Sequence, residues 1–250
     1  MSRVSESSAR VLAIAGNTYR EAIRMRLFLL LALAGVGSLG IGLFFQEFNL
    51  GASELQFIAD FGFGGMTLLG SIMAIVVSAQ LLFGEIEHRT ILPLLSKPIS
   101  RGEFAVGKLL GVWLTTCSLI AILTVSLVAA LWIRETQLAA EYPELAREGR
   151  ALVDYGGVAL FAGLQCFRLL LLASATFLFA SYASSQMFAF FMGFFFWVIG
   201  QLHSAAFHQS AHEGWLGEAI GKSVSLAIPN LRLFDLGADV IEGRGINLLS

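Results

Sequence analysis

The sequence has little charge, few cysteines and few prolines. Only 14% of its 250 residues are charged, against about 25% in an ordinary soluble domain. With two cysteines and four prolines, a disulfide-stapled secreted module and a collagen-like repeat are excluded, and the low polarity excludes a disordered chain. A net charge of −2 without a long basic run argues against nucleic-acid binding. Cys117 and Cys166 belong to no CxxC pair, so we expect no redox or metal role for them.

Long apolar runs take the place of these features. Hydrophobic residues make up 56% of the chain, and the mean hydropathy is +0.76. About 20 apolar residues in a helix cross the hydrocarbon core of a membrane. We therefore predict an all-α, polytopic membrane protein with a single transmembrane domain over residues 1–250. The five predicted spans are 27–45, 61–83, 109–133, 163–182 and 186–202, and an external amphipathic segment, 203–250, follows them.

The distribution of charge predicts how these spans are oriented. Nine Lys and Arg residues lie before the first span or in the segment 84–108, together with five acidic residues. The segments on the other side carry six basic and thirteen acidic residues. Because Lys and Arg are retained on the cytoplasmic side, we expect the N-terminus and the segment 84–108 to be cytoplasmic.

Residues 1–26 have the pattern of an interfacial helix. Val11, Leu12, Ala15, Tyr19, Ala22 and Ile23 share one face at helical spacing, and Arg10, Arg20 and Arg24 lie opposite them. Such a helix lies along a membrane surface. Glu6 and Glu21, together with the absence of a cleavage site, argue against a signal or transit peptide.

Several motifs that suggest chemistry have simpler explanations. Residues 102–108 fit G-x-x-x-x-G-K, but Leu109 follows where a P-loop has Ser or Thr. Ser100 and Glu103 instead form a capping box that starts a helix, from which Lys108 is expected to extend to the lipid headgroups. The spacing of Gly107 and Gly111 predicts close helix packing. His203, His208 and His212 lack the order H-E-x-x-H, so we expect neither a metal site nor an enzyme.

A few polar residues lie inside the predicted spans. The polar side chains of Gln80, Thr115 and Thr116 could line a substrate path. Arg168 is a further candidate, since an ionisable residue within a membrane is often functional. The alternative for the hydroxyl groups is hydrogen bonding between helices. For Arg168 the alternative is a position about one and a half turns inside the fourth span, from which the side chain reaches the outer headgroups.

The segment 84–108 carries a recognisable pattern. It reads E-x-E-x-R-T, L-L, K-P-x-S-R and F-x-x-G-K, through Glu85, Glu87, Arg89, Thr90, Leu94, Leu95, Lys97, Pro98, Ser100, Arg101, Phe104, Gly107 and Lys108. This pattern resembles that of ABC-2 type transporter permeases, and more narrowly that of the NosY-like subgroup. The residues 19–24, the order of the spans and the outer stretch 229–234 extend the resemblance over most of the chain.

The resemblance implies a six-helix permease that pairs with itself or a related permease and with cytoplasmic ATPase subunits, which bind ATP and Mg. The chain itself needs no cofactor under this hypothesis. Residues 1–26 would be the elbow helix, with Arg10, Tyr19, Arg20 and Arg24. The segment 84–108 would be the coupling loop, contacting the ATPase through Glu85, Glu87, Arg89, Thr90, Leu94, Leu95, Lys97, Pro98 and Arg101. A sixth span is expected after Ser250, unless the chain departs from the family there.

We therefore predict the permease subunit of an ATP-driven exporter in the plasma membrane, which in bacteria is the inner membrane. The alternative is a subunit of the same architecture that transmits ATPase motion to an envelope protein on the outer side. The thirteen acidic residues and the outer amphipathic segment are compatible with such a docking surface. The substrate cannot be read from any residue in the chain.

Overall fold

The computed structural model describes residues 2–44, 54–87, 100–141 and 154–210, and every regular element in these ranges is a helix. The helices are α1 (Ser2–Ile23), α2 (Arg26–Phe44), α3 (Glu54–Glu87), α5 (Arg101–Glu141), α7 (Tyr155–Tyr182) and α8 (Gln186–Ser210). The predicted all-α class of a polytopic membrane protein is confirmed.

Local sequence signals start three of these helices. The capping box predicted for α5 is present: the Ser100 N–H donates to Glu103 Oε2 at 3.0 Å, and the Glu103 N–H donates to Ser100 Oγ at 3.2 Å. Helix α7 is capped by Asp154, whose carboxylate accepts from the Gly156 N–H at 3.0 Å. At the start of α8, Ser185 Oγ accepts from the Phe188 N–H. Each cap satisfies a backbone donor that a helix end otherwise leaves unpaired.

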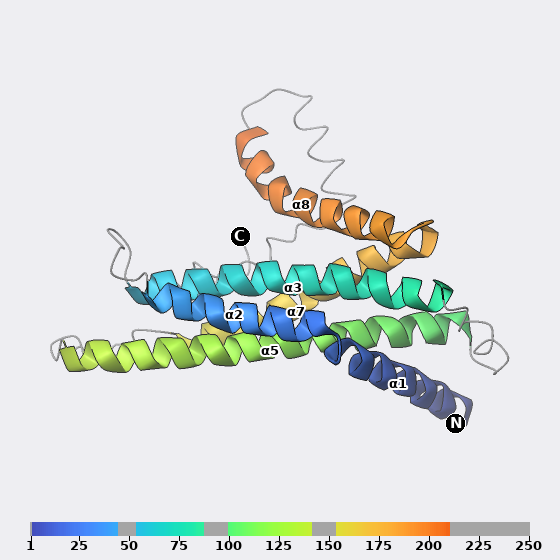
Figure 1. Cartoon of the computed structure of the whole chain (residues 1–250), viewed down its shortest axis with the longest axis horizontal. Coiled ribbons are helices and arrows are strands. Elements are labelled where there is room, and N and C mark those ends of the chain that lie inside the picture. The colour runs from blue at the N-terminus through green and yellow to red at the C-terminus, as the bar shows by residue number, and fades with distance from the viewer. Residues whose placement is uncertain (1, 45–53, 88–99, 142–153, 211–250) are drawn as a thin grey trace.

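Helix α3 is the centre of the bundle and packs against α2, α5, α7 and α8 (Figure 1). It runs antiparallel to α5, since Gly62 meets Leu127 near one end and Lys108 meets Leu81 near the other. It runs parallel to α7, since the rings of Phe63 and Phe161 are 4.2 Å apart and Gly70 meets Leu169 farther along both helices. Three helices that alternate in direction in this way fit successive crossings of a membrane.

Close approach of the three central helices depends on glycine. A Cβ at Gly70 of α3 would lie 2.8 Å from Cδ1 of Leu169 on α7 and 3.0 Å from Cδ1 of Ile120 on α5. Most of the large, fully buried side chains of the bundle are apolar: Ile58, Met66, Met73, Ile75, Leu119, Ile120, Leu127, Phe161, Leu169 and Leu172. Because lipid is as apolar as these side chains, tight packing of this kind is what holds membrane helices together.

The predicted spans 61–83, 109–133, 163–182 and 186–202 fall within α3, α5, α7 and α8, and residues 27–44 of the first span lie in α2, but several helices are longer than the spans. Helix α5 covers 101–141 and α7 begins at Tyr155, because helical hydrogen bonding continues to the caps beyond the apolar runs. Among the described residues, α3, α5 and α7 are each long and apolar enough to cross a membrane. Helices α1 and α2 meet that test only as a pair bent by 63°, and the apolar part of α8 is shorter. The five-span arrangement remains a prediction.

Candidate functional site

The functional residues predicted from sequence concentrate where α1, the last turns of α3 and the first turns of α5 meet, which we name the α1 end (Figure 1). Helix α1 lies directly on α5 at Gly107 and Gly111. A Cβ at Gly111 would lie 2.5 Å from Cβ of Thr18 and 2.9 Å from the carbonyl oxygen of Ala15. The close packing predicted for this glycine pair is confirmed, and its partner is α1.

Glu103 joins α1 to the first turn of α5. Its carboxylate accepts a short hydrogen bond from the Ser7 hydroxyl and lies 3.5 Å from the Arg10 guanidinium, in addition to closing the capping box with Ser100. Farther along, the Tyr19 and Ser118 hydroxyl groups are 2.9 Å apart. One carboxylate therefore fixes both the start of α5 and the position of α1 beside it. The sequence predicted the cap but not the contacts with Ser7 and Arg10. The signal in the sequence was their three-residue spacing, which places both on one face of a helix.

We expect Ser100→Ala and Glu103→Ala to separate these two roles. Ser100→Ala removes only a cap bond, worth about 1 kcal/mol, so amide exchange should speed up in residues 100–104 and stay unchanged in α1. Glu103→Ala removes the other bond of the capping box, from the Ser100 N–H, together with both contacts with α1, so exchange should also speed up in residues 7–14. Hydrogen exchange measured by mass spectrometry distinguishes the variants, and equal acceleration of α1 in both would contradict the assignment.

Lys108 does not reach the headgroups, and this prediction is wrong. Its side chain is 2% exposed, its ammonium donates to the Leu81 carbonyl of α3 at 3.4 Å, and it lies 5.8 Å from the centre of the Phe104 ring. The Leu81 carbonyl lies within reach of the ammonium, which therefore bonds to α3 instead of extending to the membrane surface. Lys108 therefore ties α3 to α5.

Of the predicted ATPase-contacting residues, three lie at the ends of described helices. Glu85 and Glu87 belong to the last turn of α3 and Arg101 is the first residue of α5. The others lie outside the described residues: Arg89, Thr90, Leu94, Leu95, Lys97 and Pro98. The structure thus describes the end of α3 and the start of α5, between which the predicted coupling loop lies in the chain. Both helix ends belong to the α1 end.

The predicted elbow residues divide between two environments. Arg10 and Tyr19 are partly buried and contact α5, whereas Arg20 and Arg24 are exposed. Of the predicted apolar face, Ala15 and Ala22 are buried, but Leu12 is 67% exposed. Helix α1 therefore uses part of its apolar face to pack on α5 and keeps part of it uncovered by the chain.

Arg168 lies much deeper than predicted. Because α7 begins at Tyr155, Arg168 is near the middle of the helix, next to the Leu169 that meets Gly70 and Ile120. Its side chain is 1% exposed and is the largest fully buried side chain in the described residues. The interpretation that it reaches the outer headgroups is wrong, since about 20 Å of helix separates it from the start of α7.

A second polar residue on α7, Gln165, was missed. It precedes Arg168 by one turn and is fully buried, and its amide makes no hydrogen bond within the ranges that the structure describes. A buried amide without a partner is costly. A glutamine one turn from an intramembrane arginine is the sequence signal that could have found it.

The other candidates for a substrate path lie in different surroundings. Thr115 and Thr116 are buried and donate to carbonyls of their own helix, those of Gly111 and Trp113. Gln80 is exposed on α3. The hydroxyl groups therefore satisfy their hydrogen bonds within α5, and a path through these residues remains a prediction.

The two cysteines come together between α5 and α7. Their thiols are neighbours, and the Trp113 indole N–H, one turn before Cys117, donates to the Cys166 carbonyl at 3.0 Å. Both remain free thiols. Nothing in their spacing along the chain predicted this contact, which depends on the antiparallel packing of the two helices.

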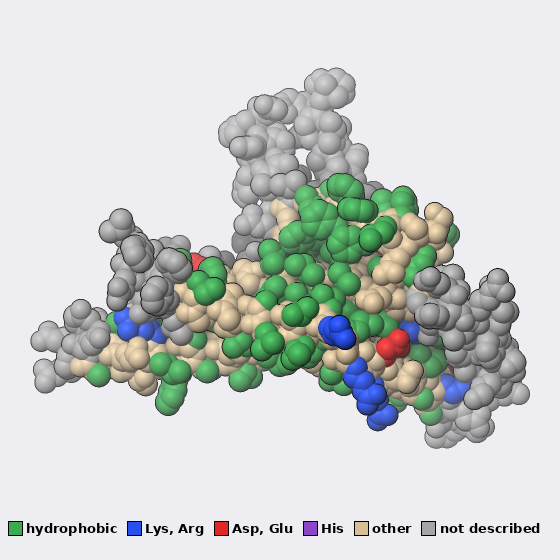
Figure 2. Space-filling model, viewed as in Figure 1, with side chains coloured by type: hydrophobic (Ala, Val, Ile, Leu, Met, Phe, Trp, Pro, Cys, Tyr) green, Lys and Arg blue, Asp and Glu red, His purple; other side chains and the backbone are tan. Residues whose placement is uncertain are grey.

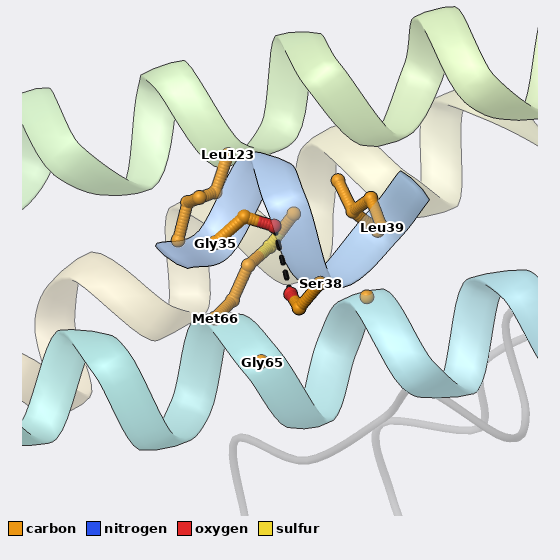
Figure 3. A pocket seen from close by; sticks show the side chains of 7 residues that line it. Gly35, Ser38, Leu39, Gly65, Met66 and Leu123 are labelled. Carbon is orange, nitrogen blue, oxygen red and sulfur yellow. Dashed lines mark hydrogen bonds between the residues drawn. The ribbon is translucent and has the colours of Figure 1, made fainter. Parts of the chain in front are cut away.

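A small crevice lies between α2, α3 and α5, away from the α1 end. Figure 3 shows the side chains that line it. Gly35, Ser38, Leu39, Gly62, Gly65, Met66 and Leu123 line it. The Ser38 hydroxyl donates to the Gly35 carbonyl at 2.7 Å. Its hydrogen is thus already used within the helix, and the rest of the lining is glycine and apolar side chains. No group of three metal-binding side chains occurs among the residues that could be searched.

These features define a helical, multi-pass membrane protein whose α1 end is tied together by polar contacts. Residues 12–213, most of the chain, match the family described as ABC-2 family transporter protein. The chain therefore belongs to this family and is an ABC transporter permease. Such permeases are generally non-catalytic membrane subunits and typically pair with cytoplasmic ATPase subunits. No curated protein is similar enough in sequence to match.

Proposed function

We propose that this chain is the membrane subunit of an ATP-driven exporter and that a separate cytoplasmic ATPase acts on it through the segment 84–108. ATP and Mg bind to the ATPase, and a second permease copy or a related permease completes the transporter. The pattern from Glu85 to Lys108 supports placement in the NosY-like subgroup. The excess of Lys and Arg at the α1 end supports a cytoplasmic N-terminus in a plasma membrane, the inner one in bacteria.

The observation that carries this proposal is the connection between the two ends of the predicted coupling loop. Lys108 bonds to Leu81 of α3, and Glu103 bonds to Ser7 of α1. A force applied to the loop between them would therefore reach α3, α5 and α1 together. Packed helices switch between discrete arrangements, so a small local displacement can become a larger motion of the helices.

Replacement of Leu94 or Leu95 by Asp tests the proposal. A charge in an apolar contact cannot be buried without a large desolvation cost. We therefore expect the variant to insert into the membrane normally and to lose co-purification of the ATPase subunit encoded beside it, identified by its own peptides in mass spectrometry.

Thr136→Asp is the matched control. Thr136 is exposed near the opposite end of α5, so the same charge there should leave co-purification unchanged. Equal recovery of the ATPase with native, Leu94→Asp and Leu95→Asp chains would contradict the proposed contact.

A further inference from the structure

Three arginines surround the bend between α1 and α2. Arg20 is in the last turn of α1, Arg24 is in the break and Arg26 begins α2, and all three are exposed. The two helices meet there at 63°. Figure 2 shows Lys and Arg side chains gathered on this face over α1 and its junction with α2, beside hydrophobic side chains.

The length of α2 gives the depth at which the bend would lie in a membrane. Every residue of α2 after Arg26 is uncharged through Phe44, a length of about 27 Å at 1.5 Å per residue, which nearly equals the hydrocarbon core. If α2 crosses the membrane, its apolar part begins at Arg26. Arg24 and Arg20 then lie on the water side of that boundary.

The structure gives these arginines no protein partner within the described part of the chain. Arg10, nearly three turns before Arg20 on the same helix, is partly buried and pairs with Glu103. No comparable ion pair or hydrogen bond joins Arg20, Arg24 or Arg26 to a described residue. The nearest acid in sequence is the exposed Glu21, which leaves a net positive charge at the bend.

We propose that Arg20, Arg24 and Arg26 bind the phosphate of an anionic phospholipid in the adjoining leaflet. Guanidinium groups match phosphate oxygens through two parallel hydrogen bonds, and each basic residue at an anionic membrane surface strengthens binding about fivefold. Since α1 is packed against α5 through Gly107 and Gly111, the lipid fixes the whole α1 end at the membrane surface. This site depends on the position of α2 in the membrane and not on an ATPase.

Native mass spectrometry of the full chain in detergent tests the site, with phosphatidylglycerol and phosphatidylcholine as probes. We expect Arg24→Gln to weaken phosphatidylglycerol binding about fivefold and the triple Arg20→Gln, Arg24→Gln, Arg26→Gln variant about a hundredfold. Phosphatidylcholine binding should not change. Equal phosphatidylglycerol affinity of the native and triple variant chains would overturn the proposal.

Three controls identify the source of the effect. Glu21→Gln should strengthen phosphatidylglycerol binding, because it removes the one neighbouring acid, and Arg134→Gln at the opposite end should leave it unchanged. Lysine at all three positions keeps the positive charge that orients the chain in the membrane but cannot form the two parallel hydrogen bonds of a guanidinium group. Its phosphatidylglycerol affinity should therefore lie between those of the native chain and the triple glutamine variant. Displacement of the lipid by inorganic phosphate at equal concentration would overturn the lipid assignment. If the triple variant fails to insert, the single variants decide the matter.

Discussion

Replacement of Gly111 by leucine is expected to separate α1 from α5. The new Cβ would lie 2.5 Å from Cβ of Thr18 and 2.9 Å from the backbone oxygen of Ala15, so the α1 backbone must move. Overpacking of this kind costs about 1–3 kcal/mol. Hydrogen exchange should show strong loss of protection in residues 7–19. The variant should also unfold at a lower concentration of denaturing detergent than the native chain.

Gly102→Leu is the matched control on the same helix. Gly102 is exposed, and a Cβ there would have no atom within 4 Å. Leucine is also a better helix former than glycine by up to about 1 kcal/mol, so this variant should keep α1 protected. Unchanged protection of α1 in Gly111→Leu would show that α1 and α5 do not pack as described.

The second large effect is expected at Arg168. Arg168→Ala removes the largest fully buried side chain in the described bundle, and a large-to-small change in a core costs about 2–5 kcal/mol. Arg168→Met keeps most of the volume and removes the charge. Since well-packed apolar side chains can replace buried charges without loss, this variant should remain within about 1.5 kcal/mol of the native chain.

Reversible unfolding in mixed micelles measures both variants. The account requires the alanine variant to be the less stable one. If both variants retain native stability, Arg168 is not enclosed by packed helices, and its position in the middle of α7 would need revision.

Hydrophobic runs predicted the helices well because an uncharged stretch of membrane length has few other conformations available. The capping box at Ser100 and the close packing at Gly107 and Gly111 were also readable, since both are local patterns. The ends of the helices could not be predicted as well. Asp154 before an apolar run is a cap signal that would have placed the start of α7 correctly, and with it the depth of Arg168.

Contacts between helices account for the remaining errors and omissions. Lys108 was expected at the headgroups because its sequence neighbours do not reveal that Leu81 of α3 lies beside it. The contact of Glu103 with Ser7 and the pairing of Cys117 with Cys166 likewise join segments far apart in the chain. Of the candidate site, the sequence predicted the elbow and loop residues by resemblance, while the ties that connect them came from the packing of α1, α3 and α5.

A photo-crosslinking amino acid at Leu94, in the chain expressed together with the ATPase proposed to act on it, tests the central claim most directly. The same probe at Gln137, exposed near the opposite end of α5, is the control. The account predicts an adduct from position 94 that contains peptides of the ATPase subunit and none from position 137. An ATPase adduct from position 137, or no ATPase adduct from position 94, would contradict the claim that the ATPase engages the α1 end.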